Sequence, residues 1–107
     1  MNEILLGRLK NSPELYVFEP KYRSVSAFIT GYDVALEGEL LSGFTEWLAE
    51  KLGHSHNLTW HTLILKLAFP GDGDVRDKLN EDESNRRAIS FLVDQLSEFL
   101  ESTSRLK

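Results

Sequence analysis

Apolar residues recur at helical spacing in several separate stretches of this chain, and this periodicity constrains the fold more than any other feature. Between residues 22 and 36, the stripe consists of Val25, Phe28, Ile29, Tyr32 and Ala35. Comparable stripes predict further helices at 3–10, 39–52, 58–68 and 84–103. Each stripe provides one face that a neighbouring helix must cover. We therefore predict an all-α fold, a compact bundle of four to five helices, in a single domain spanning 1–107.

The segment between the first two predicted helices is bounded by Pro13 and Pro20. Both prolines bias the residue before them towards extended geometry. We therefore expect an extended segment near residues 14–19, which would place Leu15, Val17 or Phe18 against the core.

Glycine, loop composition and chain position give three further local predictions. Gly31 lies inside the stripe of the second predicted helix, which suggests that another helix crosses closely there. Residues 70–83 lack periodicity and are rich in acids, so we expect a solvated loop with at most a helical turn at 74–79. The tail from Ser102 should fray.

Trp47 and Trp60 lie on apolar stripes, and we expect both in the core.

The composition of the chain limits the partners, the chemistry and the location that the protein can have. The net charge of the 107 residues is −5, which disfavours nucleic acid and anionic membranes as partners because both repel an acidic surface. The chain has no cysteine, so disulfides and thiolate chemistry are excluded. No signal peptide and no run of about 20 apolar residues is evident, so we expect a cytoplasmic protein. A domain this small has little room for a large cofactor, and we expect none.

The residues suited to metal chemistry form incomplete patterns. His54, His56 and His61 are the only histidines, and we interpret them as solvated loop residues rather than zinc ligands. Asp72, Asp74 and Asp77 resemble part of a calcium loop, but Arg76 occupies a ligand position and the required glycine is missing. No nucleophile elbow or phosphate-binding loop occurs, so we expect no enzymatic activity.

Negative charge is segregated along the chain. Residues 24–50 carry a net charge of −5 with no lysine or arginine, and residues 70–83 carry −4. Counting residues along the predicted third helix places Glu39, Glu46 and Glu50 on one side. A solvated face would explain this pattern, and so would a surface that docks a basic protein. The candidate partner-binding residues are Glu37, Glu39, Glu46, Glu50, Asp72, Asp74, Asp77, Glu81 and Asp82.

Several stretches of the sequence resemble a recurring bacterial pattern. They are 11–16 (NSPELY), 24–35 (SVSAFITGYDVA), 43–53 (GFTEWLAEKLG), 57–60 (NLTW), and the pairs Phe91-Leu92 and Phe99-Leu100. This pattern is similar to that of small helical immunity proteins of bacterial toxin systems, including contact-dependent growth inhibition. Within it, Phe28, Gly31 and Trp60 are expected to have structural roles. The acidic 70–83 loop departs from the family pattern.

The resemblance implies a cytoplasmic protein that binds and neutralises a cognate toxin domain, the C-terminal part of a large secreted protein. Many such toxins are nucleases with basic substrate-binding surfaces. An acidic inhibitor can cover such a surface, and we favour a ribonuclease as the target. The alternatives are a helical regulatory or scaffolding module that binds another basic protein, and a small hydrolase or metal-dependent enzyme.

Overall fold

The chain forms a helical bundle. The computed structural model describes residues 1–53, 57–71 and 73–107. In chain order, the helices are α1 (Glu3–Asn11), the 3₁₀ helix η1 (Pro13–Leu15), α2 (Tyr22–Ala35), α3 (Phe44–Leu52), α4 (Trp60–Ala68), the 3₁₀ helix η2 (Val75–Asn80) and α5 (Asp82–Ser102). No strand occurs among the described residues. The predicted all-α fold is confirmed.

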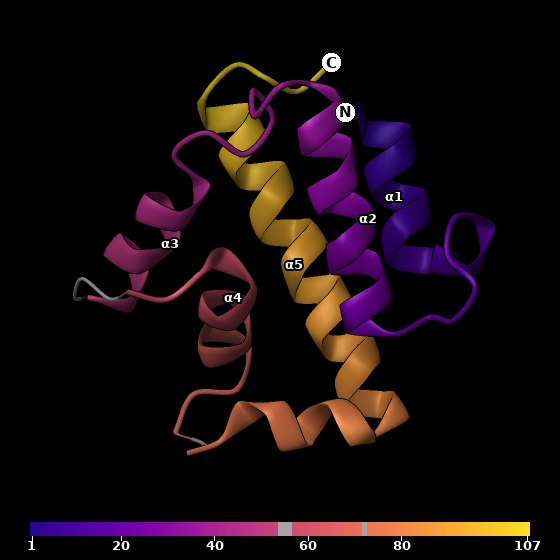
Figure 1. The fold of residues 1–107 in the computed structure, drawn as a ribbon, viewed down its shortest axis with the longest axis vertical. Helices are drawn as coiled ribbons and strands as arrows, with labels where there is room; N and C mark the ends of the chain where they lie inside the picture. The colour runs from indigo at the N-terminus through magenta and orange to yellow at the C-terminus, as the bar shows by residue number, and fades with distance from the viewer. Residues whose placement is uncertain (54–56, 72) are drawn as a thin grey trace.

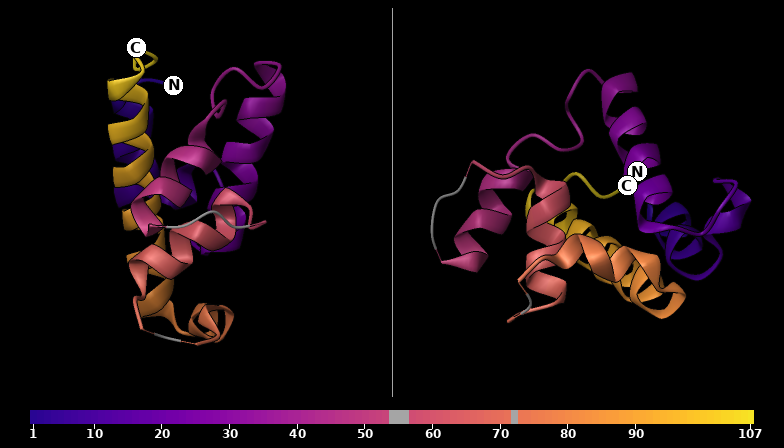
Figure 2. Two further views of the ribbon diagram at one scale, coloured as in Figure 1. Left: turned by 90° about the vertical axis from the view of Figure 1, so that its left-hand side faces the viewer. Right: turned by 60° about the horizontal axis from the view of Figure 1, so that its bottom comes forward.

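The long helix α5 is the element around which the others are arranged (Figure 1). Helix α1 packs beside it in the opposite direction, and α2 crosses α5 on one side (Figures 1 and 2). Helices α3 and α4 pack against each other and against α5, and η2 closes the end of the bundle where α5 begins. The radius of gyration is 13.2 Å, as expected for a compact domain of this length.

One continuous hydrophobic core receives side chains from all five α-helices. Its largest fully buried side chains are Phe44, Leu9, Ile29, Leu48, Leu63, Ile64, Ile89, Leu92, Leu96 and Leu100. Trp60 is buried as predicted, and Trp47 is half-buried against the core. These stripes hold the bundle together because burying apolar surface is the main favourable term in folding.

The first helix follows the local signals in its sequence. Asn2 precedes α1 in extended geometry, and its Oδ1 accepts a hydrogen bond from the Leu5 N–H at 2.9 Å. This bond satisfies one of the amide groups that every helix N-terminus leaves without a partner. Glu3 in the first turn and Lys10 in the last complement the helix dipole.

The segment after α1 differs in part from the extended geometry expected for 14–19. Pro13–Leu15 form a 3₁₀ turn, because Pro13 with its fixed φ starts such a turn readily. Bends continue the chain towards α2. Of the three residues that we expected as candidates for core contact, Val17 packs against the core, as does its neighbour Tyr16, whereas Leu15 and Phe18 are exposed (63% and 99%).

The chain between α2 and α3 also differs from prediction. The predicted third helix begins at residue 39, whereas α3 begins at Phe44 and residues 36–43 form successive turns. Glu37, Gly38 and Gly43 adopt positive φ angles of 57°, 81° and 88°. Such angles are incompatible with a right-handed helix, which therefore cannot start before Gly43.

The C-terminal tail is anchored rather than frayed. Ser104 has a φ of 58°, and the Arg105 N–H donates to the Leu100 carbonyl at 2.7 Å, a left-handed turn that closes α5. The Arg105 guanidinium then donates to the carbonyls of Leu40 (3.3 Å) and Ser42 (2.6 Å). The end of the chain thus holds the 36–43 turns, which sequence periodicity does not reveal.

Candidate functional site

The predicted partner-binding acids fall into two groups. Four lie between α2 and the end of α3, and four more lie in η2 and at the start of α5; the ninth, Asp72, is outside the described residues. The segments that carry the two groups occupy opposite parts of the bundle in Figure 1. The structure therefore does not bring all the predicted residues together.

The first group, which we call the α3 acidic segment, consists of Glu37, Glu39, Glu46 and Glu50. All four residues are exposed, and none forms an ion pair with another described residue. Glu46 and Glu50 lie one turn apart on α3. Glu39 precedes the helix, so the prediction that it continues their row along one helix face is wrong.

The turns that carry Glu37 and Glu39 are held at several points. The Gly38 N–H donates to the Asp33 carbonyl at 2.9 Å, which closes the end of α2. The Asp33 carboxylate accepts the Leu41 N–H at 2.8 Å, and Leu40 is buried. Together with the two bonds from Arg105, these contacts hold the acidic turns against the bundle.

Helix α3 is held by a cluster of aromatic rings. The ring of Phe44 lies 6.1 Å from Trp47, 5.8 Å from Trp60 and 5.1 Å from Phe99. Lys51 lies over the Trp47 ring at 4.0 Å, and its Nζ contacts side-chain oxygens of α5. The only basic residue of α3 is thus directed towards α5, while Glu46 and Glu50 remain exposed to solvent.

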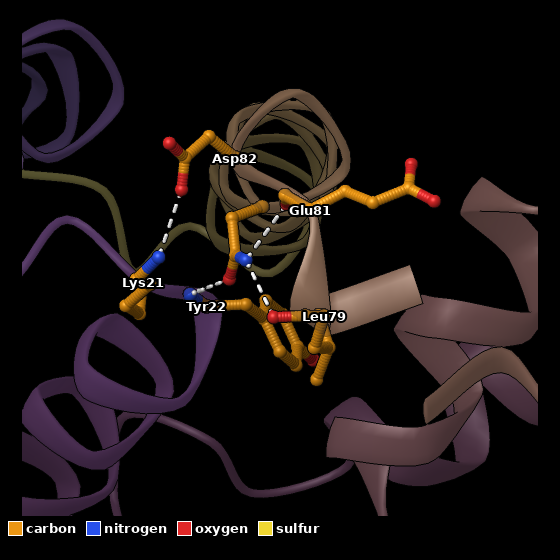
Figure 3. Close-up of polar contacts among 6 residues, drawn as sticks. Lys21, Tyr22, Leu79, Glu81 and Asp82 are labelled. Carbon is orange, nitrogen blue, oxygen red and sulfur yellow. Dashed lines mark hydrogen bonds and ion pairs between the residues drawn. The ribbon is translucent and has the colours of Figure 1, made fainter. Parts of the chain in front are cut away.

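Basic residues of the chain itself partly neutralise the second group, Asp74, Asp77, Glu81 and Asp82. Asp74 accepts hydrogen bonds from Arg76, from its N–H at 3.0 Å and from its Nε at 3.2 Å. Asp82 pairs with Lys21 at 2.9 Å (Figure 3). Hydrogen bonds from Arg76 and Lys21 lower the pKa of Asp74 and the pKa of Asp82, respectively.

Within the acidic 70–83 stretch, the helical turn that we expected at 74–79 forms as η2. This helix buries Val75 and Leu79, so the segment covers the core as well as carrying charge. Asp77 and Glu81 are exposed, and Glu81 accepts a hydrogen bond from the Ser84 hydroxyl at 3.1 Å. This group therefore offers less unpaired negative charge than its sequence suggests.

Sequence reasoning missed Asn85, a polar residue that is 1% exposed. Its Oδ1 accepts the Tyr22 N–H at 2.7 Å, and its Nδ2 donates to the carbonyls of Leu79 (2.8 Å) and Glu81 (3.0 Å). Figure 3 shows these partners meeting beside the Lys21–Asp82 pair. Asn85 thus joins the start of α2 to the end of η2 and the start of α5. The sequence did contain a signal that Asn85 is buried, because residue 85 falls at the same helical spacing as the buried apolar residues of α5.

His61 lies in the predicted 58–68 helix, but it is not solvated as we expected. It lies on α4, half-buried, with its ring stacked on Trp60 at 3.7 Å. Its Nε2 lies 3.1 Å from Thr30 Oγ1, and the Thr30 hydroxyl also donates to the Ser26 carbonyl at 3.0 Å. Burial lowers the pKa of His61. His54 and His56 lie outside the described residues.

Neither a metal cluster nor a membrane-spanning helix is evident in the described part of the chain. No three histidine, aspartate or glutamate side chains gather there as a metal-binding group. Within the same residues, no helix is both long enough and apolar enough to cross a bilayer. No protein-family model, curated protein or solved structure matches the chain.

Proposed function

We propose that this chain is an immunity-type inhibitor that binds a cognate toxin domain, a nuclease and most specifically a ribonuclease, in the cytoplasm. In this proposal it does not catalyse a reaction. It covers the basic, nucleic-acid-binding surface of the toxin with its own negative charge. The motif resemblance supplies the class of partner, and the distribution of unpaired carboxylates indicates the surface.

The observation that carries the proposal is the α3 acidic segment. Its four carboxylates are exposed and without ion pairs among the described residues, whereas Asp74 and Asp82 are bound to basic residues of the chain. An unpaired carboxylate loses less on docking with an arginine or lysine, because it has no existing partner to release. We therefore assign the main contact to Glu37, Glu39, Glu46 and Glu50 rather than to the group around η2.

The anchoring of this segment fits such a role. Asp33, the buried Leu40 and Arg105 fix the turns, and the aromatic cluster fixes α3, so the backbone that carries the four glutamates is held before a partner arrives. Preorganisation reduces the entropy lost on binding. Complementary charge mainly accelerates encounter, and it does so less at high salt.

The test begins with the product of the neighbouring gene, which the proposal identifies as the toxin. Its C-terminal domain should co-purify with this chain in a defined stoichiometry, and adding the chain should abolish cleavage of an RNA substrate. Absence of both a complex and inhibition would refute the immunity function. A complex with a basic protein that lacks toxin activity would support the regulatory-module alternative instead.

Paired charge reversals would then locate the surface. The double variant E46K/E50K should slow association by about tenfold or more at low salt, and the difference should shrink as salt rises. The matched control E14K/E19K changes the net charge equally at two exposed acids outside the candidate set. Equal slowing by both variants would indicate a general charge effect and refute the assignment to α3.

A further inference from the structure

Helix α2 presents an outer face that no other described element covers. It packs on the core through Tyr22, Val25 and Ile29. The opposite side carries Ala27, Gly31 and Val34 at steps of four and three residues, and all three are exposed, Val34 by 70%. We call these three residues the α2 outer face.

Several large apolar side chains on α2 and on the segments next to it in sequence are exposed. Among the described residues, the large exposed apolar side chains besides Ile4 on α1 are Leu15, Phe18, Val34 and Leu36, which lie on α2 or on the segments adjoining it. The Tyr16 ring lies 5.7 Å from the Phe28 ring, which places the segment before α2 alongside the helix.

Gly31 provides a second observation. A Cβ added at this position would meet no atom within 4 Å, and its φ is not in the positive range. Our prediction of a close helix crossing at Gly31 is therefore wrong within this chain. A glycine inside a helix is destabilising relative to alanine, and nothing in the folded chain requires it here. A helix approaching from outside would require it, because small residues allow helix axes to come close.

The charges around the α2 outer face indicate what kind of protein would bind to it. Between residues 24 and 35 the only charged side chain is Asp33, whose carboxylate is bound to the Leu41 N–H. Arg23 lies in the first turn of α2, and Glu37 lies two residues beyond its end, in the turns that follow the helix. Neither forms an ion pair with a described residue. Such a face is self-complementary, since an antiparallel copy sets each Arg23 opposite the Glu37 of the other chain.

We propose that this protein forms a two-fold symmetric dimer through the α2 outer face, with the two α2 helices antiparallel and Gly31 near their crossing. A two-fold interface requires one surface that complements itself, and the Arg23–Gly31–Glu37 arrangement meets that requirement. The uncharged centre supplies the buried contact, and the terminal charges set the orientation. The proposal does not depend on the function proposed above. Glu37 is shared with the α3 acidic segment, but Ala27, Gly31 and Val34 lie outside that segment.

The first test measures mass in solution by sedimentation equilibrium, at protein concentrations from about 1 µM to about 500 µM. The wild-type mass should rise with concentration from that of one 12.2 kDa chain towards that of two. G31R should weaken association by at least about tenfold. The matched control G7R places the same side chain at another helical glycine with open space around it and should dimerise like the wild type.

Circular dichroism of both variants would show whether the helices are intact. A wild-type chain that stays monomeric throughout the range would overturn the proposal. Equal loss of association in folded G31R and folded G7R would also overturn it. If G31R does not fold, A27R tests the same face, since Ala27 is exposed one turn earlier.

Charge exchange tests the antiparallel arrangement separately. R23E and E37R should each weaken the dimer, because each sets like charges opposite one another, and the double variant R23E/E37R should restore association. Failure of the double variant to recover would refute the antiparallel pairing. E37R also changes a residue that we assign to toxin contact. G31R and A27R leave all four glutamates of the α3 acidic segment in place, so these two variants show whether toxin inhibition is independent of dimer formation.

Discussion

Replacing Asn85 with alanine should destabilise the protein more than any other change of a single polar side chain. Asn85 contributes three hydrogen bonds, to the Tyr22 N–H and to the carbonyls of Leu79 and Glu81. The Glu81 carbonyl keeps a second donor, the Asn85 N–H at 3.0 Å. The variant therefore leaves two groups without partners, the N–H of Tyr22 and the carbonyl of Leu79.

The expected loss of stability follows from those two groups. Each buried polar group left unpaired costs about 1–3 kcal/mol, so N85A should lower the free energy of unfolding by about 3–4 kcal/mol. Domains of this size are stable by only about 5–15 kcal/mol, so the loss is large. The midpoint of thermal unfolding should fall by about 10–20 °C. Urea titration followed by circular dichroism measures the free energy directly.

Two companion variants isolate the cause. N80A removes the same side chain at an exposed position and should change stability by less than about 0.5 kcal/mol. N85D keeps the acceptor for the Tyr22 N–H but places a carboxylate against the two carbonyls, so at neutral pH it should also be strongly destabilised. A cost below about 1 kcal/mol for N85A, or wild-type stability for N85D, would refute the role assigned to this residue.

Three further predictions concern single residues. E37G should raise the free energy of unfolding by about 0.5–1 kcal/mol, because Glu37 has a φ of 57° that glycine adopts without strain; thermal unfolding would show a higher midpoint. Burial lowers the pKa of His61, so the unfolded chain binds the proton more tightly and stability falls as the pH drops below the ordinary histidine pKa of about 6.5. H61Q should lose this part of the pH dependence between about pH 7 and pH 5, which urea titrations at each pH would reveal. R105A should destabilise by about 1–2 kcal/mol and speed amide exchange in residues 36–43, since Arg105 binds the carbonyls of Leu40 and Ser42; unchanged exchange there would contradict this anchoring role.

The sequence alone predicts the helical parts of the fold well, because the signals for them are local. The apolar stripe of α5 and the Asn2 cap of α1 depend on residues within a few positions of one another. The predicted ranges 3–10, 22–36 and 84–103 therefore lie within two residues of α1, α2 and α5 at each end. The error at 39–43 arises because Gly38 and Gly43 take left-handed conformations, which apolar spacing does not report.

The candidate site depended on contacts between distant parts of the chain. Charge counting identified nine acids but gave no indication that Lys21 neutralises Asp82, 61 positions away, or that Arg105 anchors the turns near Glu39. Periodicity likewise placed Gly31 on a helix but could not show that its surroundings are open.

The sequence by itself determined which segments are helical and which side of each is apolar, since both depend on spacing along the chain. Only the tertiary structure decided which carboxylates remain unpaired and which helix face stays uncovered. Both properties depend on distances through space, and these are set when all the helices pack together.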